Sequence, residues 1–207
     1  VRDYLGLPLV TPQICDEVQG LALPDDDVID QLGVDVRGLF PLNSHNWNVT
    51  ASDAGDNWEY HDEWGLTHHK PKPDGLYFSV VKSPLDRPRL TVDDVHNYAW
   101  PDTGDLRRIS GLRELALSYR AQGRAVMVKG VLAGIFEMSQ RVRGMQSIMI
   151  DLASNEVLAC AFLDKMVELK IKFWERALPA LGELVDVISE ADDYGTQTSQ
   201  LISPRMF

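Results

Sequence analysis

One short stretch, the apolar run LVDVIS at residues 184–189, constrains the fold of this chain most strongly. Its β-branched residues are typical of a buried strand, and Glu190, Asp192 and Asp193 follow it directly. In a β/α architecture such a loop lies at the carboxyl end of the strand, where these folds place their chemistry. The same loop, with Gly195, also fits a simple turn in which an Asp side chain bonds its own backbone.

Strands are also predicted at residues 34–40 and 125–128, and helices separate the three strands. Residues 106–122 are amphipathic, and apolar residues at steps of three and four predict the longest helix, from Ser154 or Asn155 to about residue 182. On that helix the charged residues are interpreted as a solvated face; they are Lys165, Glu168, Lys170 and Lys172. This alternation predicts an α/β fold with parallel strands. One domain over residues 1–207 is expected.

Residues 48–90 are interpreted as an excursion from this fold. Two β-prone runs, 58–65 and 75–81, flank a Pro- and Gly-rich segment, which predicts a β-hairpin at about residues 56–82. The excursion also contains imidazoles and carboxylates, namely His61, Asp62, Glu63, His68 and His69. Because they show no recognised ligand spacing, a structural hairpin or lid is favoured over a metal site, and no metal ligand is assigned.

Charge and cysteine content narrow the classes of partner. The net charge of −11 disfavours nucleic acid and anionic membranes as partners, since both attract a basic face. Cys15 and Cys160 are far apart and have no metal spacing, which is typical of a reduced cytoplasmic protein. Neither a membrane-spanning apolar run nor a secretory leader is recognised, so a soluble protein is expected.

Several polar residues follow the predicted strands. Asn43 and His45 follow the first strand, Lys129 and Glu137 the second, and Arg141 and Arg143 lie just beyond. Gly130 and Gly134 are expected to let the backbone approach a ligand closely, although no Lys-Ser/Thr follows as a phosphate loop requires. After the third strand, Ser203 and Pro204 predict the start of a helix. Because that helix would be cut short and Val1 is not an initiator Met, the chain is expected to be part of a longer polypeptide.

An ordered set of motifs resembles the uroporphyrinogen decarboxylase superfamily, in the branch with an Asp-Asp-x-Gly-Thr-Gln loop that is related to corrinoid-dependent methyltransferases. The motifs are LGVDV at 32–36, DEWG at 62–65, YAWPD at 98–102, GIFE at 134–137, RG at 143–144, DDYGTQ at 192–197 and ISP at 202–204. The resemblance implies a (β/α)8 TIM barrel. A complete barrel needs about 250 residues, so a partial barrel is expected here.

The resemblance implies two chemistries at the carboxyl mouth of the barrel: decarboxylation of a tetrapyrrole, or zinc-assisted methyl transfer between a corrinoid protein and a thiol. The sequence does not determine the identity of a cofactor. Zinc and corrinoid are implied by the resemblance, with the zinc ligands expected beyond this chain. The Arg-rich segment with which the decarboxylases grip their substrate has no counterpart before Val34. A methyltransferase-like enzyme is therefore the first hypothesis, with a small-molecule or corrinoid-protein substrate and a homo-oligomer as a further expectation.

The predicted site follows from these strand ends. Asp192, Asp193 and Glu137 are predicted to be catalytic, because carboxylates suit acid/base work or a cationic substrate. The predicted substrate-binding residues are Gln197, His45, Asn43, Lys129 and Arg143. A decarboxylase, which would use Lys129, Arg141 and Arg143 as cations, is the second hypothesis. A non-catalytic barrel protein is the third.

Overall fold

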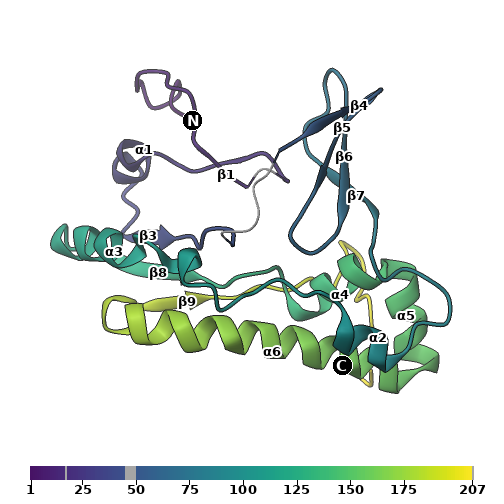
Figure 1. The fold of residues 1–207 in the computed structure, drawn as a ribbon. Coiled ribbons are helices and arrows are strands. Elements are labelled where there is room, and N and C mark those ends of the chain that lie inside the picture. Colours follow the sequence, from purple (N-terminus) through teal and green to yellow (C-terminus); the bar gives the residue numbers. More distant parts are fainter. Residues whose placement is uncertain (17, 45–49, 207) are drawn as a thin grey trace.

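The computed structural model describes residues 1–16, 18–44 and 50–206 as a mixed α/β fold with three small sheets (Figure 1). A parallel sheet has the order β3 (Val36–Leu39), β8 (Ala125–Lys129), β9 (Val187–Ser189). An antiparallel sheet is formed by β4 (Ser52–Ala54), β5 (Asn57–His61), β6 (Thr67–Pro71) and β7 (Ser79–Lys82). Near the N-terminus, β1 (Ile14–Asp16) pairs with β2 (Leu21–Ala22).

The α-helices are α1 (Asp26–Gln31), α2 (Val92–Asn97), α3 (Leu112–Ala121), α4 (Ile135–Arg143), α5 (Met145–Ser154) and α6 (Glu156–Leu181). Short 3-10 helices, η1 (Leu106–Ile109) and η2 (Gly182–Leu184), precede α3 and β9. Two helix starts follow the sequence signals. Asn155 caps α6, and Thr91 and Asp94 form a capping box at α2.

The prediction of a (β/α)8 barrel, complete or partial, is wrong. The three predicted strands do form and pair in parallel, with Val36 opposite Ala125 and Met127 opposite Val187. However, the described parallel sheet has only three strands, and β3 and β9 are both edges. Between β3 and β8 the chain builds the antiparallel sheet, whose strands pair with one another and not with the parallel sheet.

Helices α3 and α6 cover one face of the parallel sheet. Val126 and Val128 of the central strand are buried there against Leu112 of α3 and Leu181 at the end of α6. The edge strand differs, because Val187 and Ile188 remain 46% and 49% exposed. Parallel strands are normally buried on both faces, so β9 is the least protected part of this sheet.

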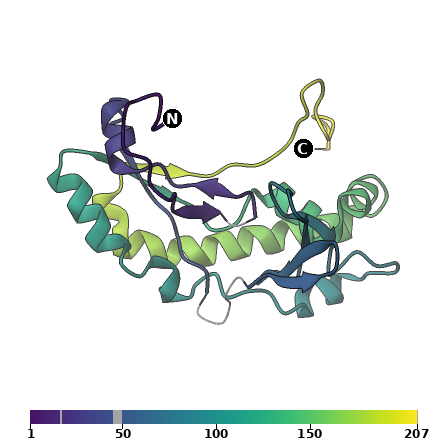
Figure 2. The same cartoon turned by 90° about the horizontal axis from the view of Figure 1, so that it is seen from above.

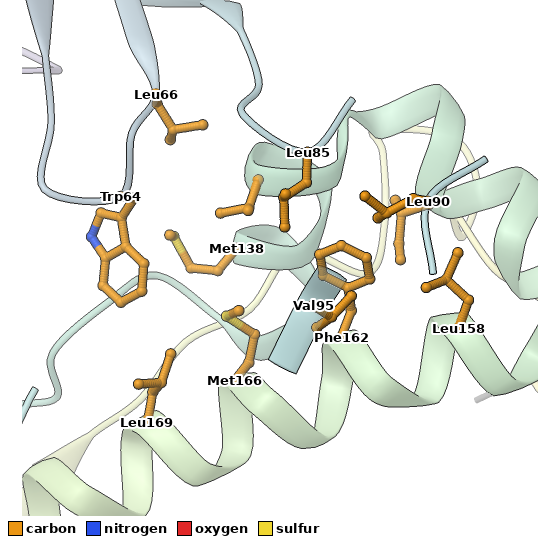
Figure 3. Packing of buried hydrophobic residues seen from close by; sticks show 12 residues of the cluster. Trp64, Leu66, Leu85, Leu90, Val95, Met138, Leu158, Phe162, Met166 and Leu169 are labelled. Carbon is orange, nitrogen blue, oxygen red and sulfur yellow. The ribbon is translucent and has the colours of Figure 1, made fainter. Parts of the chain in front are cut away.

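The largest apolar cluster lies where α6 passes beneath the β5–β6 connection (Figure 3). Trp64 and Leu66 from that connection meet Met166 and Leu169 of α6, and Val95 of α2 packs beside Phe162. Figure 1 shows α6 along the lower side of the molecule, below β8 and β9 at one end and reaching α2 and α5 at the other, and Figure 2 shows the same helix from above. This long helix therefore joins the two packing centres.

The antiparallel sheet differs from the predicted hairpin. The two β-prone runs correspond to β5 and β7, but β6 lies between them and pairs with both. Strand β6 contains His68, His69, Lys70 and Pro71. The sequence had assigned its last two residues, Lys70 and Pro71, to the connection between the two runs. Here cross-strand pairing outweighs the weak strand propensity of Lys and Pro.

Of the helix predicted to begin at Ser203, the described residues show a single turn. Residues 204–206 form a turn, in which the Met206 N–H donates to the Ser203 carbonyl at 2.9 Å. Among the described residues, no helix combines the length and apolar character needed to span a membrane.

Candidate functional site

The loop after β9 is anchored on the first turn of α4 through Asp192. Its Oδ2 accepts a hydrogen bond from the Phe136 N–H, and its Oδ1 accepts one from the Glu137 N–H, both at 2.8 Å. Gly134, the N-cap residue of α4, has no side chain to satisfy these donors. Asp192 supplies the cap from a distant segment, and its negative charge suits the positive end of the helix dipole.

Glu190 forms a second anchor between the same loop and α6. One carboxylate oxygen pairs with the Lys170 ammonium, and the other accepts from Trp174 Nε1 at 2.8 Å. Lys170 also donates to the Val131 carbonyl at 3.4 Å. The ion pair therefore ties the loops after β8 and β9 to one helix.

Gly130 and Gly134, expected to admit a ligand, instead admit these two carboxylates. A Cβ at Gly130 would overlap the Glu190 carboxylate, and one at Gly134 would overlap Asp192. The close approach predicted from the glycines is present, but protein side chains occupy it. The loops after β8 and β9 thus form one polar edge, which we call the β8–β9 edge, defined by Gly130, Gly134, Glu190, Asp192 and Asp193.

An aromatic pair closes one side of the β8–β9 edge. Tyr194 stacks on Phe136 with ring centroids 5.5 Å apart and ring planes 1° from parallel. Desolvation, followed by the hydrogen bond to Asp192 and the charge of Asp192, raises the pKa of Tyr194 to about 12. This neutral phenol helps to fix the orientation of Asp192.

The remaining predicted catalytic carboxylates have different surroundings. Asp193 is exposed, and its side chain makes no hydrogen bond or ion pair with another described residue, although its N–H donates to Asp192 Oδ1 at 2.9 Å. Glu137 lies in the first turn of α4 and pairs with Arg141 one helical turn on. Lys129 is exposed at the end of β8, opposite Ser189. The structure therefore brings Asp192, Asp193 and Glu137 together.

Other predicted binding residues lie elsewhere. Asn43 is exposed after β3, and Gln197 is exposed in the turn closed by the bridge between Gly195 and Gln200. Arg143 is buried at the end of α4, where it pairs with Asp151 at 2.8 Å and donates to the carbonyls of residues 85 and 87. His45 lies outside the described residues.

Lys170 is the residue of this site that the sequence analysis missed. It was assigned to a solvated face, but it is 9% exposed. The helical spacing contained the signal, because position 170 lies four residues after Met166 and three before Phe173, both fully buried. A charged residue on an apolar stripe needs a partner, and Glu190 provides it.

Two hollows in the described surface lie away from the β8–β9 edge. One of about 740 Å³ borders the end of α6 near Arg113, and one of about 480 Å³ lies between α2 and α6 beside Cys160. Neither is lined by Glu190, Asp192 or Asp193.

Polar residues of the excursion also have defined partners. Glu63 pairs with buried Arg108 at 2.6 Å, and His68 Nε2 lies 2.9 Å from Asp62 Oδ2. The fixed DEWG motif therefore holds the β5–β6 connection in place.

Comparisons with models of protein families, with characterised proteins and with solved structures gave no significant match.

Proposed function

We propose that this chain is a methyltransferase-like enzyme of the uroporphyrinogen decarboxylase superfamily, and that its substrate binds at the β8–β9 edge. The ordered motifs support the class of enzyme, although the described residues do not form the barrel that the resemblance implies. The proposed position of the substrate site depends on one observation: the carboxylates of Glu190 and Asp192 pack directly against Gly130 and Gly134. Two loops after neighbouring parallel strands thereby make one surface, as substrate sites of α/β sheets commonly do.

The chemistry follows from which carboxylates are already engaged. Asp192 and Glu190 accept hydrogen bonds from the α4 N-terminus, Lys170 and Trp174, so they position the loop. Asp193 remains exposed to a ligand. In methyl transfer to a thiol the acceptor must lose its proton, and a carboxylate at the edge is a suitable general base.

Zinc, which the resemblance implies, does not fit this edge. The carboxylates of Glu190 and Asp192 are already bound by protein donors, and the described residues include no group of three His, Cys, Asp or Glu arranged to hold a metal ion. No step of the proposed mechanism uses zinc. The corrinoid protein enters only as the methyl-donating substrate.

Decarboxylation is the weaker alternative because the arginines that it would use already form ion pairs within the protein. Arg143 is buried against Asp151, and Arg141 pairs with Glu137, which leaves Lys129 as the exposed cation among the residues assigned to that reaction. One cation is a poor match for a substrate with several carboxylates.

The two reactions are tested side by side on the purified protein. We expect methyl transfer from methylcobalamin to a thiol, which is measured as formation of the thioether product. We expect no conversion of uroporphyrinogen to coproporphyrinogen. Coproporphyrinogen formation without methyl transfer would reverse the order of the hypotheses. The absence of both reactions would overturn the proposed enzyme class.

A further inference from the structure

The face of the parallel sheet that points away from α3 and α6 is apolar. Val126 of β8 packs against these helices, and side chains alternate along a strand, so Ala125 and Met127 point to the other face. Val36 of β3 lies directly opposite Ala125, and Val187 of β9 lies directly opposite Met127. We call the surface formed by Val36, Ala125, Met127 and Val187 the open face.

Two valines at the rims of the open face remain in contact with solvent. Val36 is 39% exposed and Val187 is 46% exposed, whereas Val126 on the helical face is fully buried. Parallel strands are normally covered on both faces. Because removal of apolar side chains from water is favourable, a partner that covers the open face gains binding free energy there.

The chain as a whole exposes more surface than a compact protein of its mass. Its accessible surface is 12474 Å², whereas a compact monomer of 23.2 kDa exposes about 9,700 Å². The difference of about 2,800 Å² exceeds the roughly 800 Å² that each partner buries in a stable interface of standard size. The chain therefore has enough uncovered surface to form a stable complex.

We propose that the open face is a dimer interface, through which two copies of this chain pack their parallel sheets against each other. A two-fold interface needs a patch that complements itself, and an apolar patch does so without charge pairing. Residues 36, 125, 127 and 187 are uncharged, and Lys129 borders them at the carboxyl end of β8.

The charge of the chain favours this face over other surfaces. Each copy has a net charge of −11, so two copies repel one another over most of their surface. The uncharged open face is where this repulsion opposes close approach least. The proposal uses only the strands of the sheet, and it is independent of methyl transfer at the β8–β9 edge.

The test is sedimentation equilibrium of the purified chain over a range of protein concentrations. We expect a dimer that dissociates on dilution. Val187→Asp should raise the dissociation constant by about 10-fold or more, because it places a carboxylate in an apolar interface. Val36→Asp, on the opposite edge strand, is a second variant of the same face and should weaken the dimer in the same way.

Ile188→Asp is the matched control. Ile188 is 49% exposed on the same strand, close to the exposure of Val187, but it pairs with Val128 and therefore points to the helical face. This variant should form dimers like the unmodified protein. Circular dichroism should show the same secondary structure in all three variants, because the replaced side chains are all more than a third exposed.

Salt distinguishes an apolar interface from an ionic one. A higher ionic strength screens the repulsion between two chains of net charge −11, so it should strengthen the dimer. The proposal is overturned if the chain is monomeric at every concentration or if salt weakens the dimer. It is also overturned if Ile188→Asp dissociates the dimer as much as Val187→Asp and Val36→Asp do.

Discussion

The two larger sheets use their polar residues in opposite ways. In the parallel sheet the strands are largely apolar, and the carboxylates Glu190, Asp192 and Asp193 come after β9 has ended. In the antiparallel sheet the ionisable groups lie within the strands, as Glu59 and His69 do on facing positions. The difference follows in part from burial, because Val126 and Val128 of the central strand β8 are packed against helices and leave no place there for charges, whereas an antiparallel strand often has an exposed face.

The largest expected effect tests how the antiparallel sheet is attached to the rest of the protein. Arg108→Ala should lower the free energy of unfolding by about 3–5 kcal/mol, because it leaves the Glu63 carboxylate buried and unpaired. Urea denaturation measures this loss. Arg107→Ala in the same 3-10 helix removes an exposed side chain and should cost far less. Equal losses would show that the buried ion pair does not hold the sheet.

A smaller effect tests the asymmetry within the parallel sheet. Val128→Ala should cost about 2 kcal/mol, since Val128 is 1% exposed beneath α3 and α6. Ile188→Ala, at the paired position on β9, should cost less than about 1 kcal/mol because nearly half of Ile188 is exposed. Similar losses in thermal or urea unfolding would contradict the description of β9 as a poorly protected edge.

The smallest effect concerns the contact between Tyr194 and Asp192. The pKa of Tyr194 is raised to about 12, so its ionisation should appear in the tyrosinate absorbance near that pH, as the difference between the unmodified protein and Tyr194→Phe. Because the pKa is higher in the folded state, this contribution to stability is complete below about pH 10 and is lost as the pH rises through about 12. Asp192→Asn should lower this pKa. An ordinary tyrosine pKa for Tyr194 in the unmodified protein would contradict the contact with Asp192.

The sequence predicted the parallel sheet well, for identifiable reasons. The β-branched runs correctly predicted strands at β8 and β9, but the burial expected for the run at residues 184–189 is wrong, since Val187 and Ile188 are 46% and 49% exposed. The barrel was wrong because it was inferred from a resemblance. Local strand signals do not determine how many strands a sheet contains or where its edges lie.

The antiparallel sheet was harder to predict. The contact between Glu59 and His69 depends on the register between β5 and β6, and β6 contains Lys70 and Pro71, which are typical of a connection. Without that register Glu59 and His69 have no visible relation. Lys170 was missed for another reason, since its charge outweighed its position on the apolar stripe of α6.

The most direct test of the proposed site compares two exposed carboxylates at opposite ends of the parallel sheet. Asp193 follows β9 at the carboxyl end, and Asp35 precedes β3 at the amino end. Methyl transfer from methylcobalamin to a thiol should fall by about 100-fold or more in Asp193→Asn and remain unchanged in Asp35→Asn, with both variants as stable as the unmodified protein. Unchanged turnover in Asp193→Asn would contradict the assignment of the β8–β9 edge as the substrate site.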